Sequence, residues 1–178
     1  MPEETPKPID PQVLDYYRET VAPKVLLSLV RGLMEGVFEL DEESRNRVLS
    51  RMGWHCFNGF KEFLPPMETG LDLDGAFEWL NGSVPHQRRF EKAGDTIVWD
   101  GEMADVYGSC MCVLVRLGII EPRPELCVCS AHHCKTALEE ITGLRTEAEL
   151  VETVNSGCRD CVYRFHLKPT AYSSRTDK

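Results

Sequence analysis

The sequence predicts an α+β fold, in which a helical N-terminal half packs on a small antiparallel sheet and the C-terminal half is rich in cysteine. Apolar residues recur at helical spacing through most of the first 82 residues. Apolar and polar residues instead alternate in "CVYRFHLK" (161–168), the pattern of a half-buried strand. Seven of the eight cysteines follow residue 100, so the unusual chemistry is concentrated in the second half.

Length and composition indicate one folded domain. The chain has 178 residues, of which 42% are apolar and 28% are charged, as in globular proteins with a core of their own. We divide it into a disordered, Pro-rich N-terminus (1–10), a single α+β domain (11–168) and a disordered polar tail (169–178). Within the domain, residues 11–82 form the helical part and residues 94–168 form the Cys-rich mixed part.

The charge balance narrows the range of partners. With 29 acidic against 20 basic side chains, the net charge is −9, which argues against nonspecific nucleic-acid binding and against docking on anionic membranes. A small-molecule ligand is the expected partner, and a homodimer is compatible with the sequence. We find no signal peptide and no apolar run long enough to span a bilayer. We therefore expect a cytoplasmic protein, whose cysteines stay reduced and do not form a disulfide frame.

Two helices are expected before residue 65. The first begins after Pro11 and carries an apolar stripe as far as Phe38, with Pro23 as a kink or break. The second starts at Asp41, because acidic residues in its first turn suit the positive end of a helix, and it stops before Pro65-Pro66.

A third, short helix fits "DLDGAFEWLNG" (72–82), with Asp72 or Asp74 as its N-cap and Gly82 as its terminator. The following stretch, "NGSVPHQRRFEKAGD" (81–95), is expected to be a connection. A turn and a short strand from Thr96 to Trp99 come next.

Periodicity leaves part of the Cys-rich half ambiguous. A buried strand and a short helix both fit "YGSCMCVLVRLGIIEPRPEL" (107–126). A helix over residues 131–142 is clearer, because Ser130 is a good N-cap and Gly143 is a good residue just past its C-terminus.

Two Cys-x-Cys units, Cys110-Met111-Cys112 and Cys127-Val128-Cys129, dominate this half. Tetrahedral zinc and iron–sulfur clusters each take four ligands such as thiolates. The Cys-x-Cys spacing suits an extended segment, in which alternate side chains point the same way. We therefore expect a site for zinc or an iron–sulfur cluster, with the preferred ligands Cys110, Cys112, Cys127 and Cys129, and with Cys134 and His133 as nearby candidates.

The expected helix after Ser130 adds an electrostatic argument. Its N-terminus carries partial positive charge, which favours thiolate character at Cys127 and Cys129, either for metal binding or for nucleophilic attack. His133 could serve as a ligand or a base, whereas the adjacent His132 should point elsewhere. If the protein is an enzyme, we expect hydrolysis of a small C–N or C–S compound, by a metal-bound water or by Cys129 with His133 as base.

Core packing competes with these roles for the remaining cysteines. Cys134 lies on the apolar face of its helix, so packing and ligation stay open, and Cys56 lies on the stripe of the second helix, where packing is favoured. Cys158 and Cys161 form a Cys-x-x-Cys, yet Cys161 alternates with strand residues and should face the core. Cys158 is expected in the turn before that strand.

The segments "YGSCMCVLV", "CVCSAHHCKTALEEITG" and "SGCRDCVYRFHL" resemble the L-2-amino-thiazoline-4-carboxylic acid hydrolase-like family. That family is distantly related to the 4-vinyl-reductase, or hydrocarbon-binding, domains. In the broader group a helix precedes two antiparallel strands, and a Gly-x-x-Cys-x-Phe-like motif opens the last one. Gly157, Cys161 and loosely Tyr163 match that motif, and the resemblance covers residues 40–168.

This resemblance implies a strand for residues 147–154, although Thr146 and Glu149 form a capping-box pattern that alone favours a helix. Hydrocarbon-sensing relatives hold zinc with a cysteine before the last strand and the strand's own cysteine. The stretch "VETVNSG" (151–157) has no cysteine, so Glu149 or Glu152 with Cys161 would be only a remnant of that site.

Three functions stay open on the sequence. The first is a metal-binding protein resembling a small-molecule C–N or C–S hydrolase. The second is a noncatalytic ligand-binding or sensor module with structural cysteines, and the third is a thiol-redox protein. The sequence contains no Gly-rich phosphate loop, no Gly-x-Ser-x-Gly and no His-Glu-x-x-His that would point to other chemistry.

Overall fold

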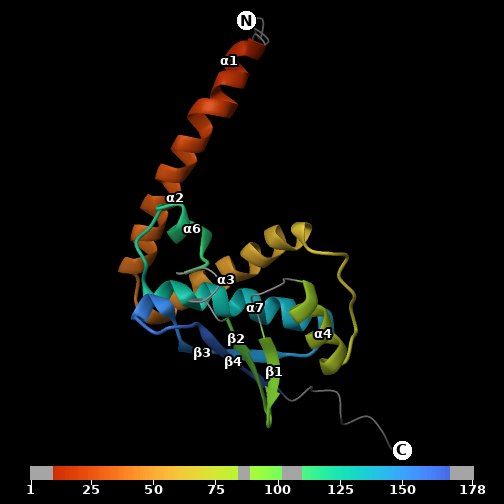
Figure 1. Ribbon diagram of the computed structural model, residues 1–178. Coiled ribbons are helices and arrows are strands. Elements are labelled where there is room, and N and C mark those ends of the chain that lie inside the picture. Colours follow the sequence, from red (N-terminus) through yellow and green to blue (C-terminus); the bar gives the residue numbers. More distant parts are fainter. Residues whose placement is uncertain (1–9, 84–88, 102–109, 169–178) are drawn as a thin grey trace, which may run out of the picture.

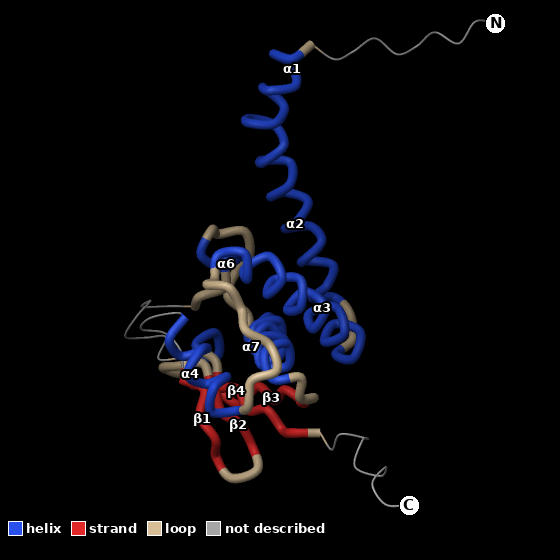
Figure 2. Tube along the Cα trace, turned by 90° about the vertical axis from the view of Figure 1, so that its right-hand side faces the viewer, coloured by secondary structure: helices blue, strands red, loops and turns tan. Residues whose placement is uncertain are grey.

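The computed structural model describes residues 10–83, 89–101 and 110–168. They form the expected α+β fold, built on a four-stranded antiparallel sheet (Figure 1). Helix α7 (Cys127–Thr142) lies on one face of the sheet, and helix α3 (Glu42–Phe60) packs on α7, which therefore runs between α3 and the sheet (Figure 2). An N-terminal helical arm projects from this body. Within the described residues, no helix combines the length and the apolar character needed to cross a membrane.

The arm consists of α1 (Pro11–Tyr16), a π-helical segment (Tyr17–Val21) and α2 (Ala22–Glu39). Asp10 begins it by accepting a hydrogen bond from the backbone N–H of Gln12 at 2.9 Å. Pro23 is the second residue of α2, which begins where the π-helical segment ends. Proline has no N–H to donate and its ring crowds the carbonyl four residues earlier, so a wider turn accommodates it. The kink expected at Pro23 is thus a π-helical segment within a continuous helix.

Helices α3 and α4 (Leu73–Ser83) begin at aspartate N-caps. The carboxylate of Asp41 accepts from the backbone N–H of Ser44, and that of Asp72 accepts from Gly75, each at 2.9 Å. The boundaries expected for α3 are confirmed, since only a 3-10 turn (Lys61–Phe63) separates it from Pro65. The terminator expected at Gly82 is wrong, because α4 continues to Ser83 and Gly82 does not adopt a left-handed conformation.

The sheet has the strand order β1-β2-β4-β3, with β1 (Arg89–Ala93), β2 (Thr96–Asp100), β3 (Thr146–Glu152) and β4 (Val162–Leu167). The expected strand from Thr96 to Trp99 is confirmed as part of β2. The segment expected as a connection instead contains β1, which pairs with β2 through a tight turn at Gly94, where φ is 64°. Only Phe90 is buried in β1, so that strand shows no alternation in its sequence.

The strand expected from the family resemblance is confirmed as β3. Its local capping-box pattern is overridden, because Glu149 lies opposite Arg164 of β4 and binds across the strands. The Glu149 carboxylate accepts from Arg164 at 3.2 Å and pairs with His166 at 2.8 Å. This cluster is partly exposed, whereas the side chain of Cys161 is buried, so Glu149 and Cys161 do not form a remnant metal site.

The Cys-rich segment differs from expectation in one respect that matters for chemistry. Helix α7 starts at Cys127, four residues earlier than expected, because a 3-10 turn (Pro124–Leu126) leads straight into it. Ser130 is therefore inside the helix and is not its N-cap. The ambiguous stretch before it holds a short helix, α6 (Val113–Arg116), which follows the first Cys-x-Cys unit. The expected left-handed Gly143 is confirmed at the end of α7, with φ of 72°.

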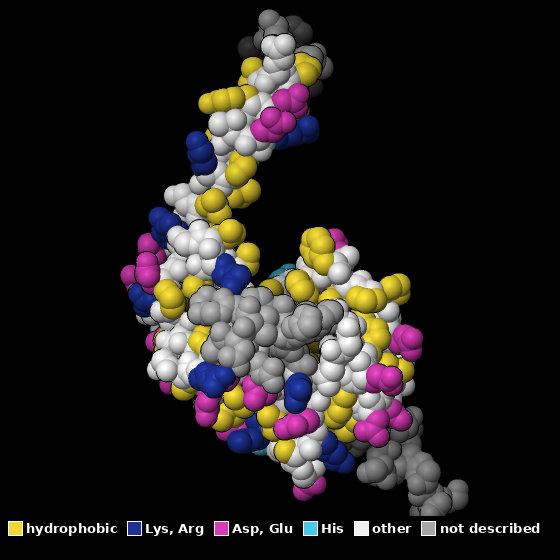
Figure 3. All heavy atoms as spheres, in the orientation of Figure 1, with side chains coloured by type: hydrophobic (Ala, Val, Ile, Leu, Met, Phe, Trp, Pro, Cys, Tyr) yellow, Lys and Arg dark blue, Asp and Glu magenta, His cyan; other side chains and the backbone are white. Residues whose placement is uncertain are grey.

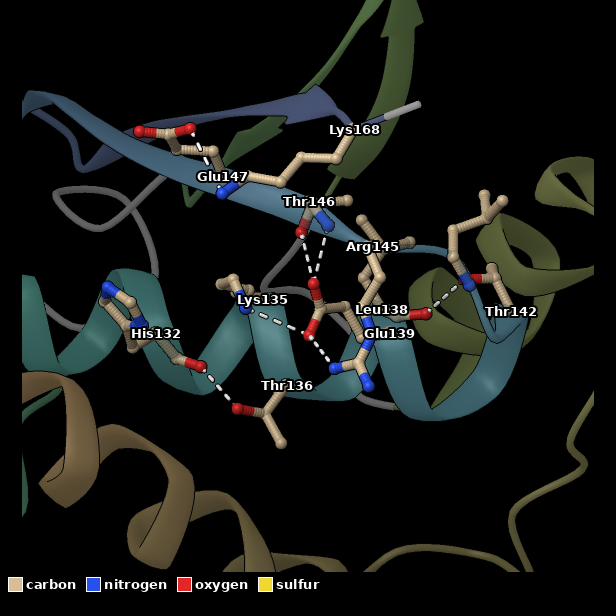
Figure 4. Close-up of polar contacts among 11 residues, drawn as sticks. His132, Lys135, Thr136, Leu138, Glu139, Thr142, Arg145, Thr146, Glu147 and Lys168 are labelled. Atoms are coloured by element: carbon tan, nitrogen blue, oxygen red, sulfur yellow. Dashed lines mark hydrogen bonds and ion pairs between the residues drawn. The ribbon is translucent and has the colours of Figure 1, made fainter. Parts of the chain in front are cut away.

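Glu139 joins the end of α7 to the start of β3 (Figure 4). Its carboxylate accepts from the backbone N–H of Thr146 at 2.6 Å and from the ammonium group of Lys135 at 2.9 Å. The guanidinium of Arg145 lies 3.8 Å away. A half-buried carboxylate that satisfies a strand's first N–H fixes where β3 leaves the helix.

Two apolar clusters form the core. The larger one fills the space between the sheet and the helices α4 and α7, and it includes stacked pairs of aromatic rings contributed by Phe90, Phe165, Trp99 and Tyr163. The smaller one joins α2, α3 and the start of α7 through Met34, Leu49, Leu126 and Cys129. Helix α7 contributes to both clusters, so its position sets how they meet.

Gly53 lets α3 approach α7 closely. A Cβ atom added there would lie 2.7 Å from Cβ of His132 and 2.9 Å from the backbone nitrogen of His133, and nearer still to the carbonyl oxygen of Cys129. Real side chains do not tolerate such contacts with backbone atoms. The residue is glycine because no other side chain fits between the two helices.

We expect Gly53→Ala to lower the free energy of unfolding by about 1–3 kcal/mol, because overpacking forces the two helices apart. The matched control is Gly59→Ala in the same helix, where an added Cβ meets nothing within 4 Å. That change should stabilise by about 0.5–1 kcal/mol, since alanine favours a helix over glycine. Urea unfolding measures both, and equal effects of the two variants would contradict a tight contact at Gly53.

Candidate functional site: a sulfur-lined pocket

A pocket of about 480 Å³ lies where the two core clusters meet. Its walls come from α3, the first two turns of α7, the segment before and within α6, and the paired strands β2 and β4. The lining residues are Met52, His55, Cys56, Trp99, Cys110, Met111, Cys112, Val113, Leu114, Leu126, Cys127, Cys129, Ser130, His133, Cys134, Cys161 and Tyr163.

Seven of the eight cysteines face this pocket. They include all five expected metal ligands, Cys110, Cys112, Cys127, Cys129 and Cys134, together with Cys56 and Cys161. Cys161 is buried as expected, while Cys158 stays in the turn outside the pocket. The packing role expected for Cys56 is wrong, because its side chain is exposed on the pocket side of α3.

The second Cys-x-Cys unit splits its sulfurs between two neighbourhoods. Residues two apart on a helix point about 200° apart, so Cys127 and Cys129 cannot act as the adjacent pair that an extended segment would present. The Cys127 thiol lies near those of Cys110 and Cys161, whose charges act on it. The pKa of Cys129 is influenced most by the charges of Cys56 and Cys112, and then by those of Cys127 and Cys134.

Thr153 forms hydrogen bonds with the thiols of Cys127 and Cys161. Its hydroxyl is 2.7 Å from Sγ of Cys127 and 3.7 Å from Sγ of Cys161. The side-chain amide of Asn155 also donates to Sγ of Cys127 at 3.4 Å. Thr153 is buried, so it holds helix α7 and strand β4 together through hydrogen bonds to sulfur.

Burial opposes ionisation of these thiols. It raises the pKa of both Cys127 and Cys129 to about 12, and the charges of neighbouring thiolates act in the same direction. Burial also raises the pKa of Cys112 and of Cys161. Burial of Cys127 and Cys129 therefore opposes the thiolate character expected at the helix N-terminus.

His133 and His132 lie on different sides of α7. His133 is buried against the aromatic rings of Phe57 and Phe60, with ring centroids 5.5 and 5.7 Å away. His132 lines a separate surface hollow beside Lys135 and Glu139, as the expected divergence of the two rings requires. Burial lowers the pKa of His132.

No three side chains of His, Cys, Asp or Glu are arranged to hold a metal ion in the part of the chain that the structure describes. The sulfurs thus share one pocket without forming a preformed coordination shell. The backbone N–H of Cys112 donates to Sγ of Cys110 at 3.4 Å, so the first Cys-x-Cys unit is folded back on itself.

Sequence reasoning missed most of the pocket outside the Cys-x-Cys units. Met52, His55 and Cys56 line the pocket from one helix. His55 and Cys56 follow Met52 by three and four residues, and this helical spacing was the signal in the sequence that places them on one face. Trp99 and Tyr163 lie opposite each other on β2 and β4, with stacked rings 4.6 Å apart. Their inward positions follow from strand alternation, but the pairing of the two strands does not.

Comparison with known proteins yields little that bears on function. No family model matches the chain, and no curated protein matches it. One solved structure that matches is trafficking protein particle complex subunit 3 from Naegleria fowleri, covalently bound to palmitic acid. The match covers 85% of this chain and 98% of that one, at 15% identity and a TM-score of 0.45. Function therefore has to be argued from the pocket.

We expect the pocket thiols to react in order of exposure. With iodoacetamide at pH 8, Cys56 should be alkylated first, whereas Cys127 and Cys129 should react roughly a hundredfold more slowly or only after unfolding, because few of them are ionised. Peptide mapping by mass spectrometry at successive times measures this order. Uniform alkylation of the native protein would contradict it.

The same pKa values predict alkaline destabilisation. A thiol whose pKa rises from about 8.5 in the unfolded chain to a higher folded value contributes its full stability below that pH and loses it as pH increases. The folded values of Cys127 and Cys129 are about 12, so the free energy of unfolding should fall between about pH 8.5 and 12. In the double variant Cys127→Ala/Cys129→Ala the free energy of unfolding should fall less steeply with increasing pH. An unchanged dependence on pH would contradict the burial of these two thiols.

Proposed function

We propose that the protein is a noncatalytic binding module for a small, uncharged, apolar molecule. The observation that carries this proposal is the 480 Å³ pocket, whose described walls contain sulfur, aliphatic and aromatic groups but no Asp, Glu, Lys or Arg. Pockets of this volume hold typical small-molecule ligands, and apolar walls with few polar groups are their usual surface. Because the thiols point to a reducing environment, we place the protein in the cytoplasm as part of this proposal.

The protonation of the thiols favours binding over catalysis. A cysteine nucleophile needs a lowered pKa or an adjacent base, whereas burial raises the pKa of Cys129. Burial has the largest influence on the pKa of that thiol, followed by the charges of Cys56, Cys112, Cys127 and Cys134. Neutral thiols behave as small apolar groups that pack well against hydrocarbon.

The walls also suggest which apolar molecules bind. The stacked rings of Trp99 and Tyr163 form one side, and sulfur atoms of Met52, Met111 and several cysteines form much of the rest. Sulfur makes favourable contacts with the edges of aromatic rings, by about 0.3–1.5 kcal/mol. An aromatic hydrocarbon or a similarly uncharged ring compound therefore fits this surface better than a carboxylate or an amine. His55, Ser130 and His133 are polar residues among those that line the pocket.

We expect Cys112→Phe to abolish binding of such ligands, because the larger side chain fills the pocket from its half-buried wall position. The matched control is Cys158→Phe, since Cys158 is also half-buried but does not line the pocket. Calorimetric titration with a series of neutral aromatic compounds, each paired with its carboxylate analogue, measures the effect. Wild type and Cys158→Phe should bind the neutral compounds, with the carboxylates at least tenfold weaker.

Two results would contradict this proposal. The first is equal binding by Cys112→Phe and the wild type, which would place any ligand elsewhere. The second is turnover of a thiazoline by the wild type that is lost in Cys129→Ser, which would make the protein the hydrolase that its sequence resembles. Thermal unfolding of each variant shows whether it is folded before binding is compared.

Metal binding by the same sulfurs is a second candidate function. The convergence of seven cysteines on one pocket supports it, because thiolates are the ligands that zinc and iron–sulfur clusters prefer. Among the described residues no three of these side chains are already placed to hold an ion, so metal binding would require the thiols to move together. A bound metal would lower the thiol pKa values, so its affinity should increase with pH.

Metal analysis of protein purified without oxygen separates the two candidates. If metal binding is the function, about one zinc or one cluster per chain should be present. That content should be lost in Cys127→Ser/Cys129→Ser but kept in Cys158→Ser, which changes the cysteine outside the pocket. Metal-free protein with all eight thiols titratable after unfolding would contradict this candidate.

A further inference from the structure

Two thiols from distant segments share one hydrogen-bond partner in the wall of the sulfur-lined pocket. Cys127 is the first residue of α7, and Cys161 lies directly before β4. The hydroxyl of Thr153 is 2.7 Å from Sγ of Cys127 and accepts from the thiol of Cys161 at 3.7 Å. The two sulfur atoms are therefore no farther apart than these two distances laid end to end. Both cysteines line the pocket, and they are only 2% and 4% exposed.

The walls of the pocket provide no charge to balance a buried ion. Charged side chains are spread over the surface of the body in Figure 3, whereas the described lining residues include no Asp, Glu, Lys or Arg. Four thiolates around a zinc ion carry a net negative charge, and burying such a charge without a partner is costly. A ligand that bonds both sulfurs and leaves an uncharged product avoids this cost.

The thiols favour a ligand that reacts with S–H groups. Burial raises the pKa of Cys127 to about 12 and also raises the pKa of Cys161, so both thiols are protonated at neutral pH. Trivalent arsenic suits them, because its hydroxides are neutral molecules at that pH and its soft centre prefers sulfur to oxygen. Such a hydroxide condenses with a thiol and releases water, without a net release of protons.

The number of sulfurs that lie together indicates the type of arsenical. No three side chains of His, Cys, Asp or Glu are placed to hold one ion among the described residues. Arsenous acid bonds three thiols, whereas an arsenical with one organic group bonds two. That organic group needs an apolar surface beside the sulfurs. Tyr163 follows Cys161 by two residues, is buried like it, and stacks on Trp99 with ring centroids 4.6 Å apart. An aromatic surface therefore adjoins the pair of thiols.

We propose that Cys127 and Cys161 form a dithiol site for a neutral trivalent arsenical that carries one apolar organic group. This inference rests on the proposed function, since the organic group occupies the same pocket. The compound R–As(OH)2 condenses with the two thiols: two As–O and two S–H bonds break, and two As–S bonds form. Each thiol hydrogen leaves with one hydroxyl group, so two water molecules are released and arsenic stays trivalent. The product is uncharged, as the walls of the pocket favour.

Two bonds to one chain make the complex resistant to monothiols. Glutathione has to displace both sulfurs, and a displaced sulfur remains at high local concentration beside the arsenic. The wild type should therefore keep phenylarsonous acid in the presence of glutathione and release it to a small dithiol such as 2,3-dimercaptopropanol. Complete release to glutathione would overturn the proposal.

Competition with the small dithiol measures the contribution of each cysteine. Cys127→Ala and Cys161→Ala should each bind phenylarsonous acid about a hundredfold more weakly than the wild type, because only one As–S bond remains. The matched control is Cys158→Ala, which removes the other member of the same Cys-x-x-Cys but lies outside the pocket, and its affinity should equal that of the wild type. Unchanged affinity in Cys161→Ala, or an equal loss in Cys158→Ala, would overturn the proposal.

Peptide mapping of the wild type locates the bridge without relying on a variant that might fail to fold. Trypsin cleaves after Arg159 and so separates the two members of the Cys-x-x-Cys. Mass spectrometry should detect one phenylarsenic group that joins the peptide Asp160–Arg164 to the peptide that carries Cys127. A bridge confined to one Cys-x-Cys unit or to the Cys-x-x-Cys would overturn the assignment.

Two further measurements separate this inference from the candidate functions. At neutral pH in weak buffer, phenylarsonous acid should release no protons on binding, whereas zinc releases protons from the thiols that it binds. Release of about one proton per thiol with the arsenical would overturn the condensation. Toluene tests the pocket alone. Toluene binding without an arsenic bridge would overturn this inference and leave the proposed function standing, and a bridge without toluene binding would retain the dithiol site but contradict the proposed function.

Discussion

The close contact of α3 with α7 at Gly53 is the constraint on which the rest of the structure depends. It is the most extensive contact between two described elements, and at Gly53 it leaves no room for a Cβ atom. Because glycine allows the helices to approach at Cys129 and His133, Met52 and Cys56 reach the same space as the start of α7. Without that approach, the two core clusters would not meet at a pocket with sulfur on both sides.

The pocket is a consequence of how cysteine behaves when water is removed. Each thiol is small and apolar while protonated, so seven of them can line one cavity without charge repulsion. Burial raises the pKa of Cys112, Cys127, Cys129 and Cys161 and so favours their protonated form, and the Thr153 hydroxyl forms hydrogen bonds with the thiols of Cys127 and Cys161. The same burial that stabilises the fold thereby limits thiolate chemistry and favours an apolar occupant.

Tertiary contacts override several local sequence patterns. The capping-box pattern at Thr146 does not start a helix, and the segment forms a strand that pairs with β4. Glu149 gains partners across the strands that a helix would not supply. Ser130 does not cap α7, since the 3-10 turn from Pro124 already starts the helix and carries the second Cys-x-Cys unit into it. Strand β1 shows almost no hydrophobic alternation, because only one of its residues is buried. Its place in the sheet comes from pairing with β2 and not from its own sequence pattern.

Residue order alone was enough to predict the α+β class, the start of α3 at Asp41 and the alternation of β4, because these depend on neighbours within a few residues. It left Asp72 and Asp74 both open as the N-cap of α4, and the structure selects Asp72. It could not show that Cys56 belongs with the Cys-x-Cys units or that Cys127 and Cys129 diverge. Those facts depend on how α3 crosses α7 and on where α7 begins. Contacts between distant segments set burial, and burial in turn raises the pKa of Cys112, Cys127, Cys129 and Cys161.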